Sequence, residues 1–131
     1  MRKLAIIIAA TFALNADASE PRTVTPSGQW AGQVGAKIAG CAETLLSEEA
    51  LKDLWLDAEI KGPMPTIDFR KEFALCYMGH GGPALMRLAI EPGGNLVPQY
   101  VQKPTWSERL NYLITSVKRE GVRSVNGRPI R

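Results

Sequence analysis

The run Phe-Ala-Leu-Cys-Tyr-Met at residues 73–78 contains no charged side chain. Successive side chains of an extended chain point to opposite faces, so Phe73, Leu75 and Tyr77 share one face while three further apolar residues share the other. Strands that are apolar on both faces are typical of the interior of a sheet. The run therefore predicts a central strand.

Four later segments also have the composition of strands. They are residues 85–91, 96–101, 110–117 and 122–130. Pro98 cannot donate to a strand ladder, which places the second of them at a sheet edge. Asn126-Gly127 in the last segment favours a tight hairpin. A weaker alternation between Trp30 and Leu46 adds one or two strands.

One helix is expected between residues 48 and 59. Ser47 is a good N-cap, and two glutamates follow it where the helix dipole favours negative charge. Leu51, Leu54 and Trp55 recur at helical spacing and predict a face turned to the core. Glycine and proline at residues 61–65 end the helix. The predicted fold class is α+β, one helix packed on a mainly antiparallel sheet of about five or six strands.

The first residues have the order of a secretory signal. Met1-Arg2-Lys3 precedes an apolar run at residues 4–14 and the small residues of Ala16-Asp17-Ala18. We expect a signal peptide at residues 1–18, a flexible lead-in at 19–29 and a single α+β domain at 30–131. The apolar run is too short to span a bilayer, so the mature chain is expected to be secreted or periplasmic and outside the membrane.

The net charge of the whole chain is +3 at pH 7. Acidic residues prevail up to Met86 and basic residues prevail after it, which suggests a polar surface with two faces. The basic residues are scattered along the sequence, and an exported chain is not expected to meet nucleic acid. The charge pattern is interpreted as a solvated surface.

Cys41 and Cys76 are the only cysteines. An even number in an oxidising compartment favours a disulfide between them. The alternative is a pair of buried free thiols that pack as small apolar side chains.

No motif predicts a catalytic, cofactor or metal site. His80 is the single histidine and lies in the glycine-rich turn at residues 79–83, where it is expected to be exposed and available to contact a partner. A thiol-dependent site built from His80 and Cys76 would need a sharp local turn. Asp68 is interpreted as a structural carboxylate bound by turn amides or an arginine. Trp106 lies in a predicted loop and, of the three tryptophans, is best suited to contact a partner.

Three segments resemble a set of small exported bacterial proteins of the planctomycete type, which has no assigned activity. They are Leu51-Lys52-Asp53-Leu54-Trp55, Pro65-Thr66-Ile67-Asp68-Phe69 and Arg119-Glu120-Gly121-Val122-Arg123-Ser124-Val125-Asn126-Gly127. More distantly, residues 68–90 resemble the C-terminal domain of the protease-complex subunit PrcB. That domain likewise has an Asp-Phe pair, a hydrophobic strand, a glycine-rich turn and a second strand, whereas its usual glycine-aromatic pair is Gly82-Pro83 here.

The leading hypothesis is an exported, non-enzymatic binding or modulating domain that acts on an envelope protein or protease. Two alternatives remain open at this point. The first is a small hydrolase or thiol-dependent enzyme that uses His80 and Cys76. The second is a structural component of an envelope assembly.

Overall fold

The computed structural model describes residues 20–130, so the predicted signal peptide lies outside the described residues. The elements in chain order are β1 (Arg22–Val24), β2 (Gly28–Gln33), β3 (Cys41–Leu45), α2 (Glu48–Asp57), β4 (Glu72–Gly79), β5 (Ala84–Ile90), β6 (Asn95–Gln102), β7 (Asn111–Lys118), β8 (Ser124–Val125) and β9 (Arg128–Pro129). Strand structure dominates, and the described chain is α+β with little helix.

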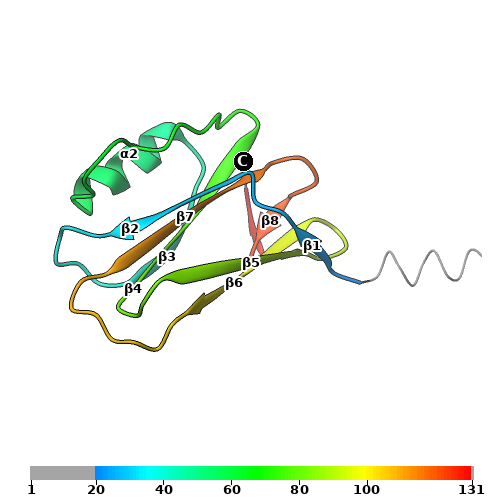
Figure 1. Ribbon diagram of the computed structural model, residues 1–131. Coiled ribbons are helices and arrows are strands. Elements are labelled where there is room, and N and C mark those ends of the chain that lie inside the picture. Colours follow the sequence, from blue (N-terminus) through cyan, green and yellow to red (C-terminus); the bar gives the residue numbers. More distant parts are fainter. Residues whose placement is uncertain (1–19, 131) are drawn as a thin grey trace, which may run out of the picture.

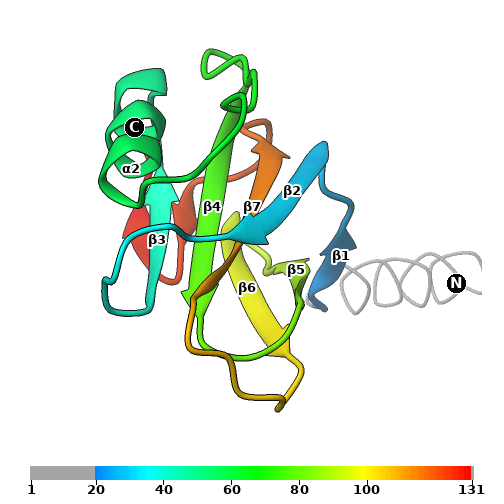
Figure 2. The same ribbon diagram turned by 60° about the vertical axis from the view of Figure 1, so that its left-hand side comes forward.

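The strands form two sheets, which corrects the expectation of a single sheet with five or six strands. One sheet has the order β2-β7-β4-β3 and is antiparallel throughout, and the other has the order β1-β5-β6-β8-β9. The second sheet is mixed because β8 runs parallel to β6. Figures 1 and 2 show the two sheets facing each other, with α2 on the outer side of the four-stranded sheet.

The central position predicted for residues 73–78 is confirmed. Phe73 and Leu75 point into the core between the two sheets, whereas Ala74 and Cys76 point into a second core beneath α2. All four side chains are completely buried. A strand with two apolar faces needs a cover on each side, and here the helix supplies one cover and the five-stranded sheet supplies the other.

The predicted helix is confirmed, although it ends at Asp57. The Ser47 hydroxyl accepts a hydrogen bond from the Ala50 amide over 3.1 Å, as expected of an N-cap. Trp55 is buried on the inner face, meets the Tyr112 ring edge-on at 5.7 Å between centroids, and donates its indole N–H to Gly62 O. These contacts fix the helix on the four-stranded sheet.

Two local expectations are corrected by long-range pairing. The segment expected to be a flexible lead-in, residues 19–29, contributes β1 and the start of β2 within its described part, because Arg22–Val24 pairs with β5. The strand that carries Pro98 is paired on both sides at its start, where β8 lies beside Asn95 and Leu96. From Val97 onward β6 is an edge, which is where Pro98 is tolerated.

Arg119 connects three segments at one end of the four-stranded sheet. Its guanidinium donates to Phe69 O over 2.8 Å, to Glu72 O over 3.0 Å and to Leu46 O over 2.8 Å. The carbonyls of Leu46 and Phe69 lie outside the strands and that of Glu72 is on the first residue of β4, and the Arg119 side chain provides a donor to each. The Arg119 side chain therefore links Leu46, just before α2, to the segment that leads into β4.

Asp68 is bound as the sequence predicts. The Arg70 amide donates to Asp68 Oδ1 over 3.2 Å and the Arg70 guanidinium donates to the same oxygen over 3.3 Å. These hydrogen bonds, the backbone one above all, lower the pKa of the Asp68 carboxyl. The Asp68 carboxylate is exposed to solvent, and its hydrogen bonds with Arg70 stabilise the turn that precedes β4.

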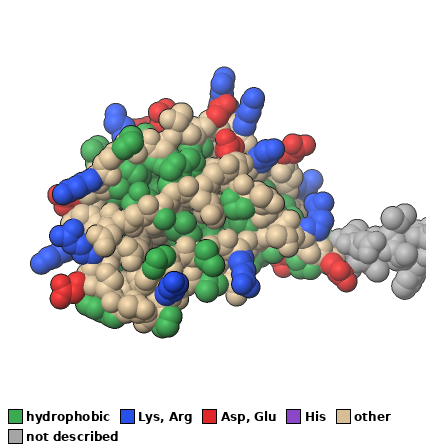
Figure 3. All heavy atoms as spheres, in the orientation of Figure 1, with side chains coloured by type: hydrophobic (Ala, Val, Ile, Leu, Met, Phe, Trp, Pro, Cys, Tyr) green, Lys and Arg blue, Asp and Glu red, His purple; other side chains and the backbone are tan. Residues whose placement is uncertain are grey.

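Figure 3 shows hydrophobic side chains over the region between α2 and the sheet beneath it, and Lys and Arg side chains around this face with Asp and Glu among them. No helix among residues 20–130 is long and apolar enough to cross a membrane.

Candidate functional site: two crossover loops

Two loops lie together at one end of the sandwich, where the chain twice changes sheet. Residues 80–83 lead from β4 in one sheet to β5 in the other, and residues 103–110 lead back from β6 to β7. We call these two segments the crossover loops. Figures 1 and 2 both show them side by side at the end of the molecule reached by β4 and β6.

Side-chain amides hold the crossover loops in place. Gln102 donates its amide hydrogens to Gly79 O over 3.1 Å and to Gly82 O over 2.9 Å, and it accepts a hydrogen bond from the Tyr77 hydroxyl. Asn111 donates to Gly81 O over 2.7 Å. The glycine-rich turn is therefore bound at three carbonyls by side chains from the strands that flank the second loop, and its position is fixed.

Glycine is required at residue 81 by the closeness of the second loop. A Cβ added to Gly81 would lie 2.6 Å from Lys103 O and equally close to the side chain of Gln102. The backbones also bond directly, because the Gly82 amide donates to Lys103 O over 3.0 Å. The composition of residues 79–83 thus follows from a close backbone approach.

His80 and Trp106, the two residues predicted to contact a partner, meet at the tip of the crossover loops. Their rings are stacked, with 5.8 Å between centroids and 5° between planes. Trp106 is 69% exposed, the largest exposed fraction among the exposed large hydrophobic side chains of the described chain. The loop therefore presents an indole face to solvent, while a neighbouring ring supports it.

The backbone of Ser107 fixes the position of His80. The Ser107 amide donates to His80 O over 2.6 Å, and His80 Nδ1 lies 3.1 Å from Ser107 O. A carbonyl oxygen can only accept, so Nδ1 carries the proton in this hydrogen bond. In the neutral ring Nε2 is then left as a solvent-facing acceptor.

Apolar side chains continue from the base of the loops onto the five-stranded sheet. Leu85 and Val101 are cross-strand partners on β5 and β6, one position from the strand ends. They are 61% and 42% exposed, respectively, because their side chains lie on the face of the sheet opposite to that of the buried Met86. The crossover loops and this pair are together the crossover surface.

The cysteines are both free, in contrast to the expected disulfide. The antiparallel register pairs Cys41 with Met78 and Cys76 with Glu43, so the two thiols are diagonal neighbours on one face. Diagonal neighbours have Cα atoms about 7–8 Å apart, beyond the usual reach of a disulfide. The register provides the physical reason for two separate thiols.

Cys76 is not placed for thiol chemistry. It is completely buried in the core beneath α2. This burial raises the pKa of its thiol to about 12, and the nearby Cys41 and Glu43 contribute smaller shifts in the same direction. His80 lies beyond the end of extended β4 with its ring bonded to Ser107 O. The structure therefore does not bring the two residues of the thiol-enzyme alternative together.

Within residues 20–130 no group of three or more His, Cys, Asp or Glu is arranged to hold a metal ion. The crossover surface, with its exposed aromatic ring and paired apolar side chains, is suited to contact with another molecule.

The sequence did not identify Gln102 and Asn111 as site residues. An amide at a strand end is common, and only the register of β6 and β7 brings these two to the glycine-rich turn. No local signal marks them.

Comparisons with known proteins add no relationship, since no protein-family model, curated protein or solved structure matches this chain.

Proposed function

We propose that this chain is an exported, non-enzymatic domain that binds another exported or envelope protein through the crossover surface. The observation that carries the proposal is the exposed Trp106 ring stacked on His80 at the tip of two immobilised loops. The resemblance of the sequence to small exported bacterial proteins agrees with this setting.

Loops that are already held in place favour binding, because association then costs less conformational entropy. The loop carrying Trp106 is tied to the first crossover loop by the amide and carbonyl of Ser107 and by backbone bonds at Lys103. Tryptophan is also a residue that often dominates binding energy when a partner buries it. A rigid, exposed indole therefore supports a contact role better than a role in the core.

A capture experiment with matched variants tests the proposal. The mature protein, Trp106→Ala and Leu56→Ala are immobilised separately and incubated with culture fluid and envelope extract of the source organism. Leu56 is the control because it is another large apolar side chain, 65% exposed, on the distant helix.

We expect one retained protein that Leu56→Ala also retains and Trp106→Ala loses. The loss should correspond to on the order of 2 kcal/mol of binding free energy, the scale of a dominant contact residue. Equal capture by all three proteins would show that the crossover surface is not the binding surface.

The envelope-assembly alternative has a separate readout. If the chain bound copies of itself through the crossover surface, its sedimentation coefficient would rise with concentration and Trp106→Ala would abolish the rise. A monomer at all concentrations, together with capture of a different protein, supports the proposal as stated.

A further inference from the structure

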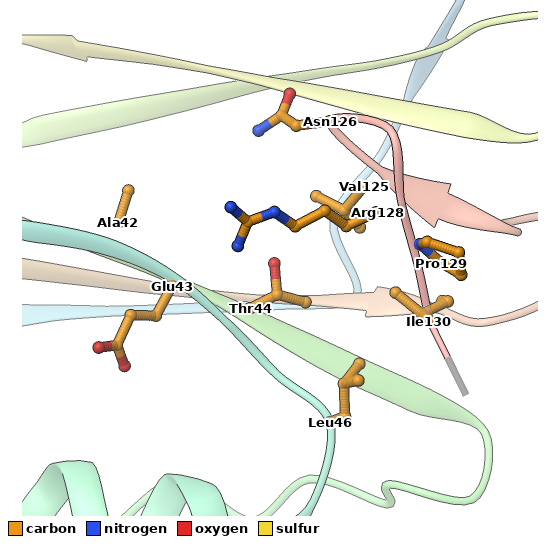
Figure 4. Close-up of a pocket in the computed structure, with 9 residues that line it drawn as sticks. All are labelled: Ala42, Glu43, Thr44, Leu46, Val125, Asn126, Arg128, Pro129 and Ile130. Atoms are coloured by element: carbon orange, nitrogen blue, oxygen red, sulfur yellow. The ribbon is translucent and has the colours of Figure 1, made fainter.

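A groove lies along the free edge of β3, between this strand and the β8–β9 hairpin. Its volume is about 660 Å³. We call it the edge groove, and Figure 4 shows the residues that line it. It is separate from the crossover loops, because none of the residues that line it belongs to them.

One wall of the edge groove is the open edge of a sheet. β3 is the last strand of the four-stranded sheet, and among the described residues it pairs only with β4. Alternate backbone N–H and C=O groups of β3 therefore point outward, and none of the hydrogen bonds within residues 20–130 uses them. An edge of this kind is a template for one more strand.

The edge of the five-stranded sheet that lies across the groove is protected, unlike the edge of β3. β9 is only two residues long and one of them is Pro129, which has no N–H to donate. β3 is five residues long and contains no proline. A strand added in this groove would therefore pair with β3 and not with β9.

The side chains of the groove suit a segment with alternating character. Ala42 and Thr44 face the groove, since their partners in β4 include Leu75 of the core between the sheets. Leu46 and Ile130 add half-buried apolar surface to the lining. An extended peptide on β3 would direct every second side chain to this lining.

Arg128 gives the groove its charge preference. Figure 4 shows its guanidinium projecting into the space between β3 and the β8–β9 hairpin, and the Glu43 carboxylate pointing elsewhere. Arg128 is exposed and makes no ion pair or side-chain hydrogen bond with the described chain. A carboxylate in the added strand would complement it.

A second copy of this chain fits the edge less well than a foreign segment. If two β3 strands paired antiparallel about their centres, Glu43 would lie directly opposite its own copy. Like charges in directly opposed positions destabilise a sheet. The edge thus favours a strand with a different sequence.

We propose that the edge groove binds an extended peptide segment of another protein, which adds a strand to β3 and places an Asp or Glu side chain against Arg128. This site goes beyond the crossover surface and does not depend on it.

The test uses a display library of short random peptides selected against the mature protein. We expect enrichment of sequences in which apolar residues alternate with polar ones and one acidic residue recurs. A synthetic peptide of that sequence should bind Arg128→Glu at least about tenfold more weakly than the unchanged protein. Arg87→Glu is the matched control, because Arg87 is an exposed arginine on β5 outside this groove.

Amide hydrogen exchange of the complex tests the strand addition itself. Alternate amides of β3 should exchange more slowly when the peptide is bound, while Trp106→Ala should bind the peptide unchanged. The proposal is overturned if no such peptide is enriched, if Arg128→Glu binds as tightly as Arg87→Glu, or if the β3 amides keep their exchange rates. Because the crossover surface plays no part, failure here leaves the capture result unaffected.

Discussion

One buried hydroxyl group in the core between the sheets has no hydrogen-bond partner among the described residues. Thr115 lies on β7, is completely buried, and its Oγ1 has no hydrogen-bond partner among residues 20–130. Burial of an unpaired hydroxyl is unfavourable, whereas the methyl group of the same side chain packs well there. Thr115 therefore offers a clean test of the packing.

We expect Thr115→Val to raise the free energy of unfolding by roughly 1 kcal/mol, since it replaces the orphan hydroxyl with a methyl group of the same shape. Thr115→Ser is the control and should lower stability, because it keeps the hydroxyl and removes the methyl. Urea denaturation measures both. Destabilisation by the valine variant would mean that the hydroxyl has a partner.

The buried Cys76 thiol makes stability depend on pH in the alkaline range. Its pKa is about 12 in the folded chain, against 9.0 for an unperturbed thiol. The raised value means that the unfolded chain ionises first as pH rises. The contribution of the thiol is therefore complete below pH 9 and is lost progressively toward pH 12.

We expect the unfolding free energy to fall between pH 9 and 12 with a slope of up to about 1.4 kcal/mol per pH unit from this group. Cys76→Ala should remove that part of the slope, although it lowers stability at neutral pH. Burial also raises the pKa values of Tyr100 and Tyr112, so they add to the slope in both proteins. The difference in slope between the unchanged protein and Cys76→Ala therefore gives the contribution of Cys76 alone. Identical slopes would show that the thiol is accessible to water.

At the scale of elements, α2 was predictable because its signals are local. A cap at Ser47 and an apolar spacing of three and four residues determine both its position and its inner face. The hairpin at Asn126-Gly127 was predictable for the same reason, since both residues adopt the positive φ angles that this turn requires.

The sheets were less predictable because their pairing is not local. β1 pairs with β5, and nothing within Arg22–Val24 indicates that partner. The turn at residues 79–83 looks like a hairpin turn, yet β4 pairs with β7 and β3 while β5 lies in the other sheet. The two apolar faces of residues 73–78 predicted a central strand, and the structure adds that a layer covers each face.

We expect Trp55→Ala to lower the free energy of unfolding by ~3–5 kcal/mol, the cost of removing a large buried aromatic side chain. The substitution also removes the edge-on contact with Tyr112 and the hydrogen bond to Gly62 O. Leu56→Ala on the exposed side of the same helix should change stability by less than about 0.5 kcal/mol. A loss below about 1 kcal/mol for Trp55→Ala would contradict the packing of α2.

At the scale of the whole molecule, the two sheets create both proposed binding sites. The crossover loops form where the chain passes between the sheets, and the edge groove forms where the edges of the sheets diverge. The sequence identified His80 and Trp106 separately. It could not show that they stack, because that contact depends on amides from strands that are distant in the sequence.

Site-specific photocrosslinking shows whether the crossover surface contacts a partner. A benzoylphenylalanine is placed at Thr105, which is exposed beside Trp106, and in a second protein at Leu56 on the helix. Each purified protein is irradiated in culture fluid and envelope extract of the source organism. We expect a discrete adduct from position 105, absent when Trp106→Ala is combined with it, and none from position 56. No adduct from position 105, or the same adduct from both positions, would show that the crossover surface is not the site of contact.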